Sequence, residues 1–151
     1  MTSRDTFKIL IAEDDADDRY LIEDAFAECG LVQQIEFVVD GVELMDYLNR
    51  KGEYEELDTK PLPNLILLDL NMPRKNGLTA LQEIKSSPEL CRIPVSALTT
   101  SKAQEDIIKT SGSGVNSFIT KPVTFENSVE VINTLTHYWE DIVTLASDKV
   151  A

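Results

Sequence analysis

The sequence has few of the residues that build thiolate or imidazole metal sites. Its 151 residues include one histidine, His137, and two cysteines, Cys29 and Cys91. These residues show none of the paired spacing that is typical of a zinc site, so a zinc-binding module is excluded. We expect two buried or half-buried free thiols, with a disulfide as the alternative, and a solvent-exposed His137.

Basic residues are also scarce, because 14 Lys and Arg stand against 27 Asp and Glu and give a formal net charge of -13. Such a surface repels the phosphates of nucleic acids and anionic lipids, so we expect neither as a direct partner. No apolar run is long enough to span a bilayer, and residues 1–5 lack the apolar region of a signal peptide. We therefore expect a cytoplasmic protein.

Five short apolar segments alternate with segments of helical periodicity. The expected strands are residues 7–12, 35–39, 65–68, 94–99 and 115–119, and the expected helices are residues 16–29, 41–50, 78–86, 102–111 and 125–146. This alternation predicts an α/β fold, a doubly wound five-stranded parallel sheet with helices on both faces. The polar residues 51–63 are expected to form an exposed loop. We predict a single domain over residues 1–151, with an extended C-terminal helix and no output domain.

Polar residues stand at the carboxyl ends of the expected strands, which such a sheet brings to one edge. Glu13 and Asp14 follow the first strand, Asp69 the third, Thr99 ends the fourth, and Lys121 follows the fifth. Neighbouring carboxylates repel one another unless a cation lies among them, and oxygen ligands suit Mg²⁺. A hydroxyl and an ammonium group bind phosphoryl oxygens, and an aspartate is a competent nucleophile. The pattern predicts phosphoryl transfer to Asp69, with Mg²⁺ and Lys121 neutralising charge.

The same residues carry a resemblance to a known family. They are Glu13-Asp14, the tract Leu68-Asp69-Leu70-Asn71-Met72-Pro73, Gly77, Thr99 and Lys121-Pro122. With this ordered set the chain resembles the CheY-like response-regulator receiver family from about Lys8 to Leu145, nearly its whole length. No single motif is decisive, but the set at receiver spacing is strongly specific. The resemblance implies a flavodoxin-like receiver fold.

The resemblance also implies roles for individual residues. Asp69 would be the phospho-acceptor and a metal ligand, and Asp14 a direct metal ligand. Glu13 would act through metal-bound water, and the main-chain carbonyl of Asn71 would be a further ligand. Phe118 stands at the position usually held by a switch tyrosine or another aromatic residue, and it cannot donate a hydroxyl hydrogen bond.

A closer likeness is to the small response regulators that are partnered with cyanobacterial phytochromes. It rests on residues 114–123, on the tail around residues 137–139 and on the long segment before the third strand. It implies a phytochrome-type histidine kinase as partner. Within the first tract we expect a cis Lys121–Pro122 bond, which costs an X-Pro bond only about 0.5–1 kcal/mol.

The acidic run continues beyond the predicted site with Asp15, Asp17 and Asp18. These residues stand where the first predicted helix begins. We expect them to be N-cap and first-turn residues, which the helix dipole favours. A direct metal role is the alternative.

Three functions compete for these residues. The favoured one is a signalling switch of a two-component phosphorelay, in which a histidine kinase phosphorylates Asp69. Such a domain catalyses only its own phosphorylation and dephosphorylation, and it switches partner binding or passes the phosphate on. The first rival is an aspartyl-nucleophile phosphohydrolase, which usually has a second Asp as general acid where this chain has Asn71. The second rival is a pseudo-receiver that binds a partner without phosphorylation, and the intact residue set argues against it.

The final predicted helix carries two apolar stripes, of which one can cover the sheet. They are Val131, Leu135, Tyr138, Ile142 and Leu145, and Ile132, Trp139, Val143 and Ala146. Burying the second stripe between two copies is favourable at about 25 cal/mol per Å² of apolar surface, before the cost of association. We therefore predict a homodimer through the fifth strand and the final helix, with two-fold symmetry.

Sedimentation at micromolar concentration tests the dimer and should give twice the monomer mass. A single monomeric species, both with and without a phosphoryl mimic, would refute it. The second stripe would then be a partly exposed apolar surface or a kinase-docking surface.

Overall fold

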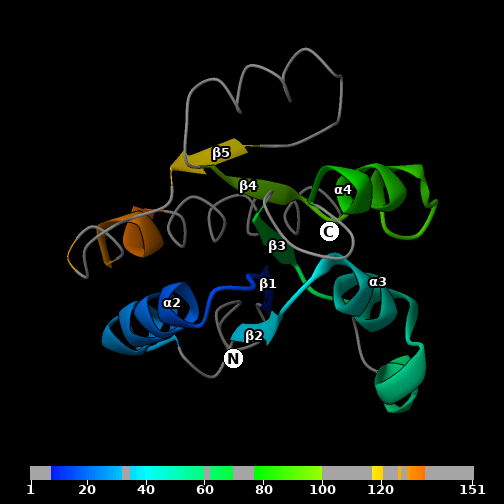
Figure 1. Cartoon of the computed structure of the whole chain (residues 1–151), viewed down its shortest axis with the longest axis horizontal. Coiled ribbons are helices and arrows are strands. Elements are labelled where there is room, and N and C mark those ends of the chain that lie inside the picture. Colours follow the sequence, from blue (N-terminus) through cyan, green and yellow to red (C-terminus); the bar gives the residue numbers. More distant parts are fainter. Residues whose placement is uncertain are drawn as a thin grey trace, which may run out of the picture.

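The computed structural model describes residues 8–31, 35–59, 62–69, 77–99, 117–120, 126 and 129–134. In chain order the elements are β1 (Ile9–Ala12), α2 (Ala16–Glu28), β2 (Ile35–Val38), α3 (Gly41–Asn49), the 3-10 helix η2 (Gly52–Thr59), β3 (Leu65–Asp69), α4 (Gly77–Ser86), β4 (Val95–Thr99) and β5 (Ser117–Thr120). The strands form one parallel sheet in the order β2-β1-β3-β4-β5 (Figure 1). This order confirms the predicted doubly wound fold.

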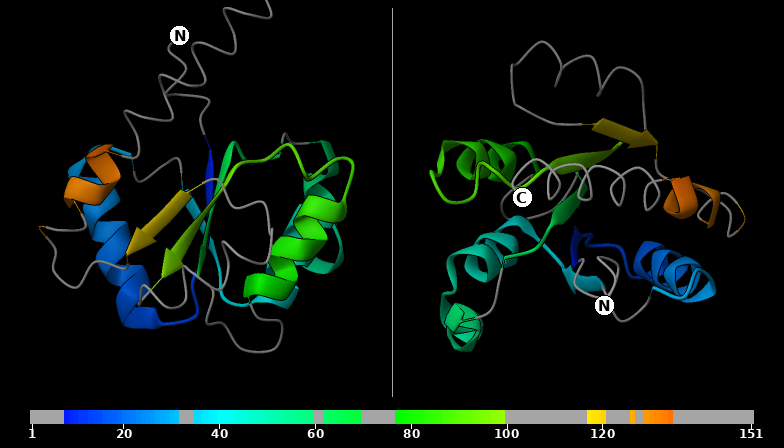
Figure 2. Two further views of the ribbon diagram at one scale, coloured as in Figure 1. Left: turned by 90° about the horizontal axis from the view of Figure 1, so that it is seen from above. Right: turned by 180° about the vertical axis from the view of Figure 1, so that it is seen from behind.

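Alternate residues of the central strands are buried on opposite faces of the sheet, as the two-residue period of a strand requires. Ile9 and Ile11 of β1 lie in one apolar cluster with Phe26 of α2. Leu10 and Ala12 lie in the other, with side chains of α3 and α4. Figure 2 shows α2 and the helical residues 129–134 over one face of the sheet, and α3 and α4 over the other.

The central strand β3 determines where the polar edge of the sheet lies. All five of its residues are buried, as expected for a parallel strand covered on both faces. Leu68 pairs with Ala12 of β1, and Asp69 pairs with Leu98 of β4. The carboxyl ends of β1, β3 and β4 are therefore adjacent.

The C-terminal part of the chain is described in pieces. β5 covers Ser117–Thr120, and residues 115–116 of the predicted strand lie outside the described residues. The predicted helix 102–111 lies outside the described residues. Of the predicted helix 125–146, residues 126 and 129–134 are helical. Residues 135–151 lie outside the description, so the dimer surface stays a prediction.

The segment 51–63, expected to be an exposed loop, contains the 3-10 helix η2, so that expectation is wrong in part. Tyr54 of η2 packs edge-on against Tyr47 of α3, with ring centroids 5.0 Å apart and planes at 62°. Burial raises the pKa of both phenols to about 12. An aromatic contact therefore connects this segment, whose composition is typical of a loop, to α3.

Arg50 closes α3 in the left-handed conformation, with φ 56° and ψ 48°. This conformation costs a residue with a side chain roughly 1–2 kcal/mol. The Arg50 guanidinium donates to the carbonyl oxygen of Tyr47 at 2.8 Å and lies 5.2 Å from the centre of its ring. The Tyr47 hydroxyl donates to Glu36 Oε2 at 2.7 Å. Tyr47 therefore joins the end of α3 to both η2 and β2.

Both cysteines are free thiols. Cys29 ends α2 and is half-buried, as predicted. Cys91 is exposed, which contradicts the expectation of a buried or half-buried thiol. It lies in the turn between α4 and β4, where its Sγ donates to the carbonyl oxygen of Pro88 at 3.7 Å.

The acidic start of α2 caps the helix as predicted. The Oδ1 of Asp15 accepts a hydrogen bond from the amide of Asp18 at 3.0 Å. Asp15→Ala removes this bond and should lower the free energy of unfolding by about 1 kcal/mol, measured by urea denaturation in metal-free buffer. The control Asp24→Ala, at an exposed position in the middle of α2, should change it by less than about 0.5 kcal/mol. Equal losses in the two variants would contradict the capping role.

Candidate metal centre

The turn between β1 and α2 carries the first two acids of the predicted site. Glu13 is fully buried, and its amide donates to the carbonyl oxygen of Val38 in β2 at 3.0 Å. Its Oε2 accepts a hydrogen bond from the amide of Asp15 at 3.2 Å. The next residue, Asp14, is exposed. One acid is therefore held inside the fold, and its neighbour is open to solvent.

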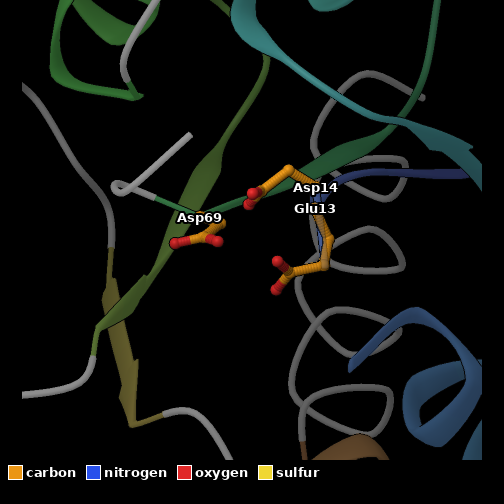
Figure 3. A group of neighbouring side chains, drawn as sticks. All are labelled: Glu13, Asp14 and Asp69. Atoms are coloured by element: carbon orange, nitrogen blue, oxygen red, sulfur yellow. The ribbon is translucent and has the colours of Figure 1, made fainter. Parts of the chain in front are cut away.

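Asp69 ends β3 and is buried, with 2% of its surface exposed. Because Ala12 pairs with Leu68, the next residues along the chain, Glu13 and Asp69, are neighbours. One carboxylate oxygen from each of Glu13, Asp14 and Asp69 lies within 4.8 Å of the other two. Figure 3 shows the three carboxylates turned toward a common space at the end of the sheet.

The composition and spacing of this cluster suit a hard divalent cation. Three close carboxylates repel one another, and oxygen atoms are the ligands that Mg²⁺ and Ca²⁺ take. Opposite oxygens around an octahedral Mg²⁺ lie about 4.2 Å apart, which is twice the bond length. Separations of up to 4.8 Å therefore close around a cation with small side-chain shifts. The acidic cluster fits a divalent metal site.

The other predicted site residues are placed only in part. β4 ends at Thr99, one residue beyond the partner of Asp69, so the main chain of Thr99 lies at the same edge. Phe118 lies within β5. Asn71 and the Lys121–Pro122 pair lie outside the described residues, as do the side chains of Thr99 and Phe118. Their assigned roles stay predictions.

Two residues that shape this edge were not predicted from the sequence. Arg19, in the first turn of α2, donates from Nη1 to the carbonyl oxygens of Glu13 at 3.0 Å and Asp14 at 2.9 Å. Asp40 follows β2, is buried, and caps α3 by accepting a hydrogen bond from the amide of Glu43 at 2.8 Å. In the sequence, Arg19 could have been singled out because it is the one basic residue of α2. Asp40 could have been recognised as an N-cap because it stands directly before a predicted helix.

Comparison with known proteins agrees with this geometry. The family model for the response regulator receiver domain matches residues 9–133. The response regulator Rcp1 of Synechocystis sp. is 37% identical over 137 residues, which are 91% of this chain and 91% of Rcp1.

Solved structures show the same relationship in three dimensions. The crystal structure of the phosphorylated cyanobacterial phytochrome response regulator RcpA matches with a TM-score of 0.77 and 39% identity, over 88% of this chain and 93% of RcpA. The Mn²⁺-bound form of Rcp1 matches with a TM-score of 0.74 and 36% identity, over 88% of this chain and 94% of Rcp1. The chain therefore belongs to the response-regulator receiver family of two-component systems.

Proposed function

We propose that Asp69 accepts a phosphoryl group from a histidine kinase in a Mg²⁺-dependent step. The observation that carries the proposal is the position of Asp69, at the end of the central strand and within 4.8 Å of the oxygens of Glu13 and Asp14. Its carboxylate attacks the phosphorus of a phosphohistidine, so a P–O bond forms, the P–N bond breaks, and the imidazole leaves with the electron pair. Water later hydrolyses the acyl phosphate and restores the carboxylate.

The three acids of the cluster have different roles in binding the cation. Asp14 and Asp69 would be direct ligands, Glu13 would act through a coordinated water, and the main-chain carbonyl of Asn71 would be a further ligand. The exposure of Asp14 suits a direct ligand, and the hydrogen bond from the Asp15 amide leaves buried Glu13 less able to move. When bound, Mg²⁺ neutralises charge on the phosphoryl oxygens.

The other side of the phosphoryl group is bound by Thr99 and Lys121, which supply a hydroxyl and an ammonium donor. The main-chain position of Thr99 beside the carboxyl end of β3 supports this role. Phe118, in β5, is the aromatic residue that changes position when these two side chains engage the phosphoryl group. The face formed by the predicted helix 102–111, β5 and the final helix is repacked as a result.

The phosphoryl donor is a kinase of the phytochrome type. The support is the similarity to Rcp1 and to RcpA, whose structure is described as that of a phosphorylated cyanobacterial phytochrome response regulator. The similarity spans about nine tenths of this chain in both comparisons. A light-sensing kinase is therefore the first donor to test.

The output is a change in protein partners in the cytoplasm. The net charge of -13 disfavours nucleic acid and anionic membranes as partners. Among the described residues, no helix has the length and apolarity that crossing a membrane requires. The domain turns over no separate metabolite. It acts as a homodimer through β5 and the final helix, and it binds a target or passes the phosphate on.

The phospho-acceptor is tested by Asp69→Asn, because an amide is a far weaker nucleophile and cannot form an acyl phosphate. Acid-labile label from a phosphorylated kinase or a small phosphodonor should fall to background. Asp15→Asn is the matched control, since it makes the same chemical change nearby and keeps a good N-cap residue. Label uptake by Asp69→Asn at the wild-type rate would refute the assignment. A wild-type chain that takes up no label would favour the pseudo-receiver.

Direct metal binding is tested by Asp14→Ala. Loss of a residue that only supports a metal ligand usually weakens metal binding by at least about 10-fold. Loss of the ligand itself should therefore weaken Mg²⁺ binding by more than about 10-fold. Calorimetric titration of the unphosphorylated protein measures it, and phosphorylation should fall in parallel. Asp17→Ala, which removes an exposed charge from the first turn of α2, should retain most of the affinity. An unchanged Mg²⁺ affinity in Asp14→Ala would sink the ligand role.

A further inference from the structure

Arg19 holds the turn that carries the two acids after β1. Its Nη1 donates to the carbonyl oxygens of Glu13 at 3.0 Å and of Asp14 at 2.9 Å. We infer that Arg19 is a positioning residue for the metal site: by binding these two carbonyls it sets the carboxylates of Glu13 and Asp14 against Asp69. The inference rests on the proposed metal-dependent function and adds a residue that touches neither the metal nor the phosphoryl group.

The geometry links the guanidinium to the buried carboxylate through one peptide group. The Asp14 carbonyl and the Asp15 amide belong to the same peptide, which is planar and rigid. Arg19 binds the oxygen side of this plane, and the amide on the other side donates to Glu13 Oε2 at 3.2 Å. Fixing the carbonyl therefore fixes the direction from which Glu13 receives its hydrogen bond.

The second carbonyl extends the same effect to Asp14. The Glu13 carbonyl and the Asp14 amide share the preceding peptide plane, and Arg19 binds its oxygen at 3.0 Å. One nitrogen thus restrains two successive peptides, on either side of the Asp14 α-carbon. Two fixed planes leave the Asp14 side chain only its own rotamers for reaching the cation.

Arg19 can impose this geometry because its own position is fixed by the helix. Its amide donates to the Asp15 carbonyl at 3.0 Å, in the first turn of α2. The same helix is anchored in the core by buried Ile22, Ala25 and Phe26. The guanidinium is also planar, with donors in fixed directions. The packing of α2 on the sheet is therefore transmitted to the acidic turn.

The charge of Arg19 and its hydrogen bonds have opposite effects on the affinity for Mg²⁺. A cation near the cluster repels a divalent metal ion, so removing the charge alone would tighten Mg²⁺ binding. Removing the two hydrogen bonds from Arg19 loosens the turn and weakens Mg²⁺ binding. The sign of the change therefore separates a positioning role from a purely electrostatic one.

The test is a titration of Mg²⁺ into the unphosphorylated full chain, with wild type, Arg19→Gln and Arg19→Lys. Arg19→Gln should weaken binding by on the order of 10-fold, as is usual when a residue that orients metal ligands is lost. Arg19→Lys keeps the charge and a hydrogen-bond donor, and it should recover part of the affinity. Because the charge itself repels Mg²⁺, recovery can come only from the hydrogen bonds.

Arg50→Gln is the matched control, because it removes the same charge and a guanidinium bond to a main-chain carbonyl, that of Tyr47 at 2.8 Å, on a different helix. Its Mg²⁺ affinity should stay at or slightly above that of wild type. The free energy of unfolding, measured without Mg²⁺, shows whether each variant is folded under the titration conditions. If Arg19→Gln proves unfolded, Arg19→Lys becomes the deciding variant and should bind several-fold more weakly than wild type.

An affinity of folded Arg19→Gln equal to or tighter than that of wild type overturns the inference, and so does an equal loss in Arg50→Gln. If Arg19→Lys is the deciding variant, wild-type affinity in it overturns the inference as well. A wild-type chain that binds no Mg²⁺ refutes instead the proposed metal site itself. The two failures are thus distinguishable in one set of titrations.

Discussion

The parallel pairing of β1 with β3 is the constraint on which the site depends. It sets Ala12 opposite Leu68, so the acids that come directly after these two residues must be neighbours. Carboxylate oxygens within 4.8 Å of one another repel by at least about 3.5 kcal/mol at an effective dielectric constant of about 20. Each buried Leu or Ile of these strands contributes about 1.5–3 kcal/mol in the other direction. Core packing therefore holds together charges that would otherwise separate, and the resulting negative potential attracts a divalent cation.

The fold and the acidic cluster could be predicted because their signals are local or follow from topology. The apolar runs of β1 and β3 are readable as buried strands, and the N-cap role of Asp15 depends only on residues one turn away. The prediction that Asp69 lies beside the other acids also required the rule that the carboxyl ends of parallel strands meet at a common edge. No knowledge of side-chain packing was required for either result.

Features that depend on tertiary contacts could not be predicted in the same way. The 3-10 helix η2 brings Tyr54 into contact with Tyr47, and no periodicity of residues 51–63 indicates this contact. The exposure of Cys91 depends on which side of a turn faces solvent. The hydrogen bonds from Arg19 to two carbonyls depend on the path of its side chain, since a sequence does not show which carbonyls a guanidinium reaches.

The docking of η2 on α3 has a consequence for how the molecule opens. Ordering a backbone residue costs about 1–2 kcal/mol. Among the described contacts of the eight-residue η2, the ring contact of Tyr54 with Tyr47 and the hydrogen bond from the Tyr54 amide to the Lys51 carbonyl oppose this cost. β3, by contrast, is buried along its whole length. We therefore expect the amide hydrogens of η2 to exchange with solvent, and its peptide bonds to be cleaved by proteases, while the sheet stays folded.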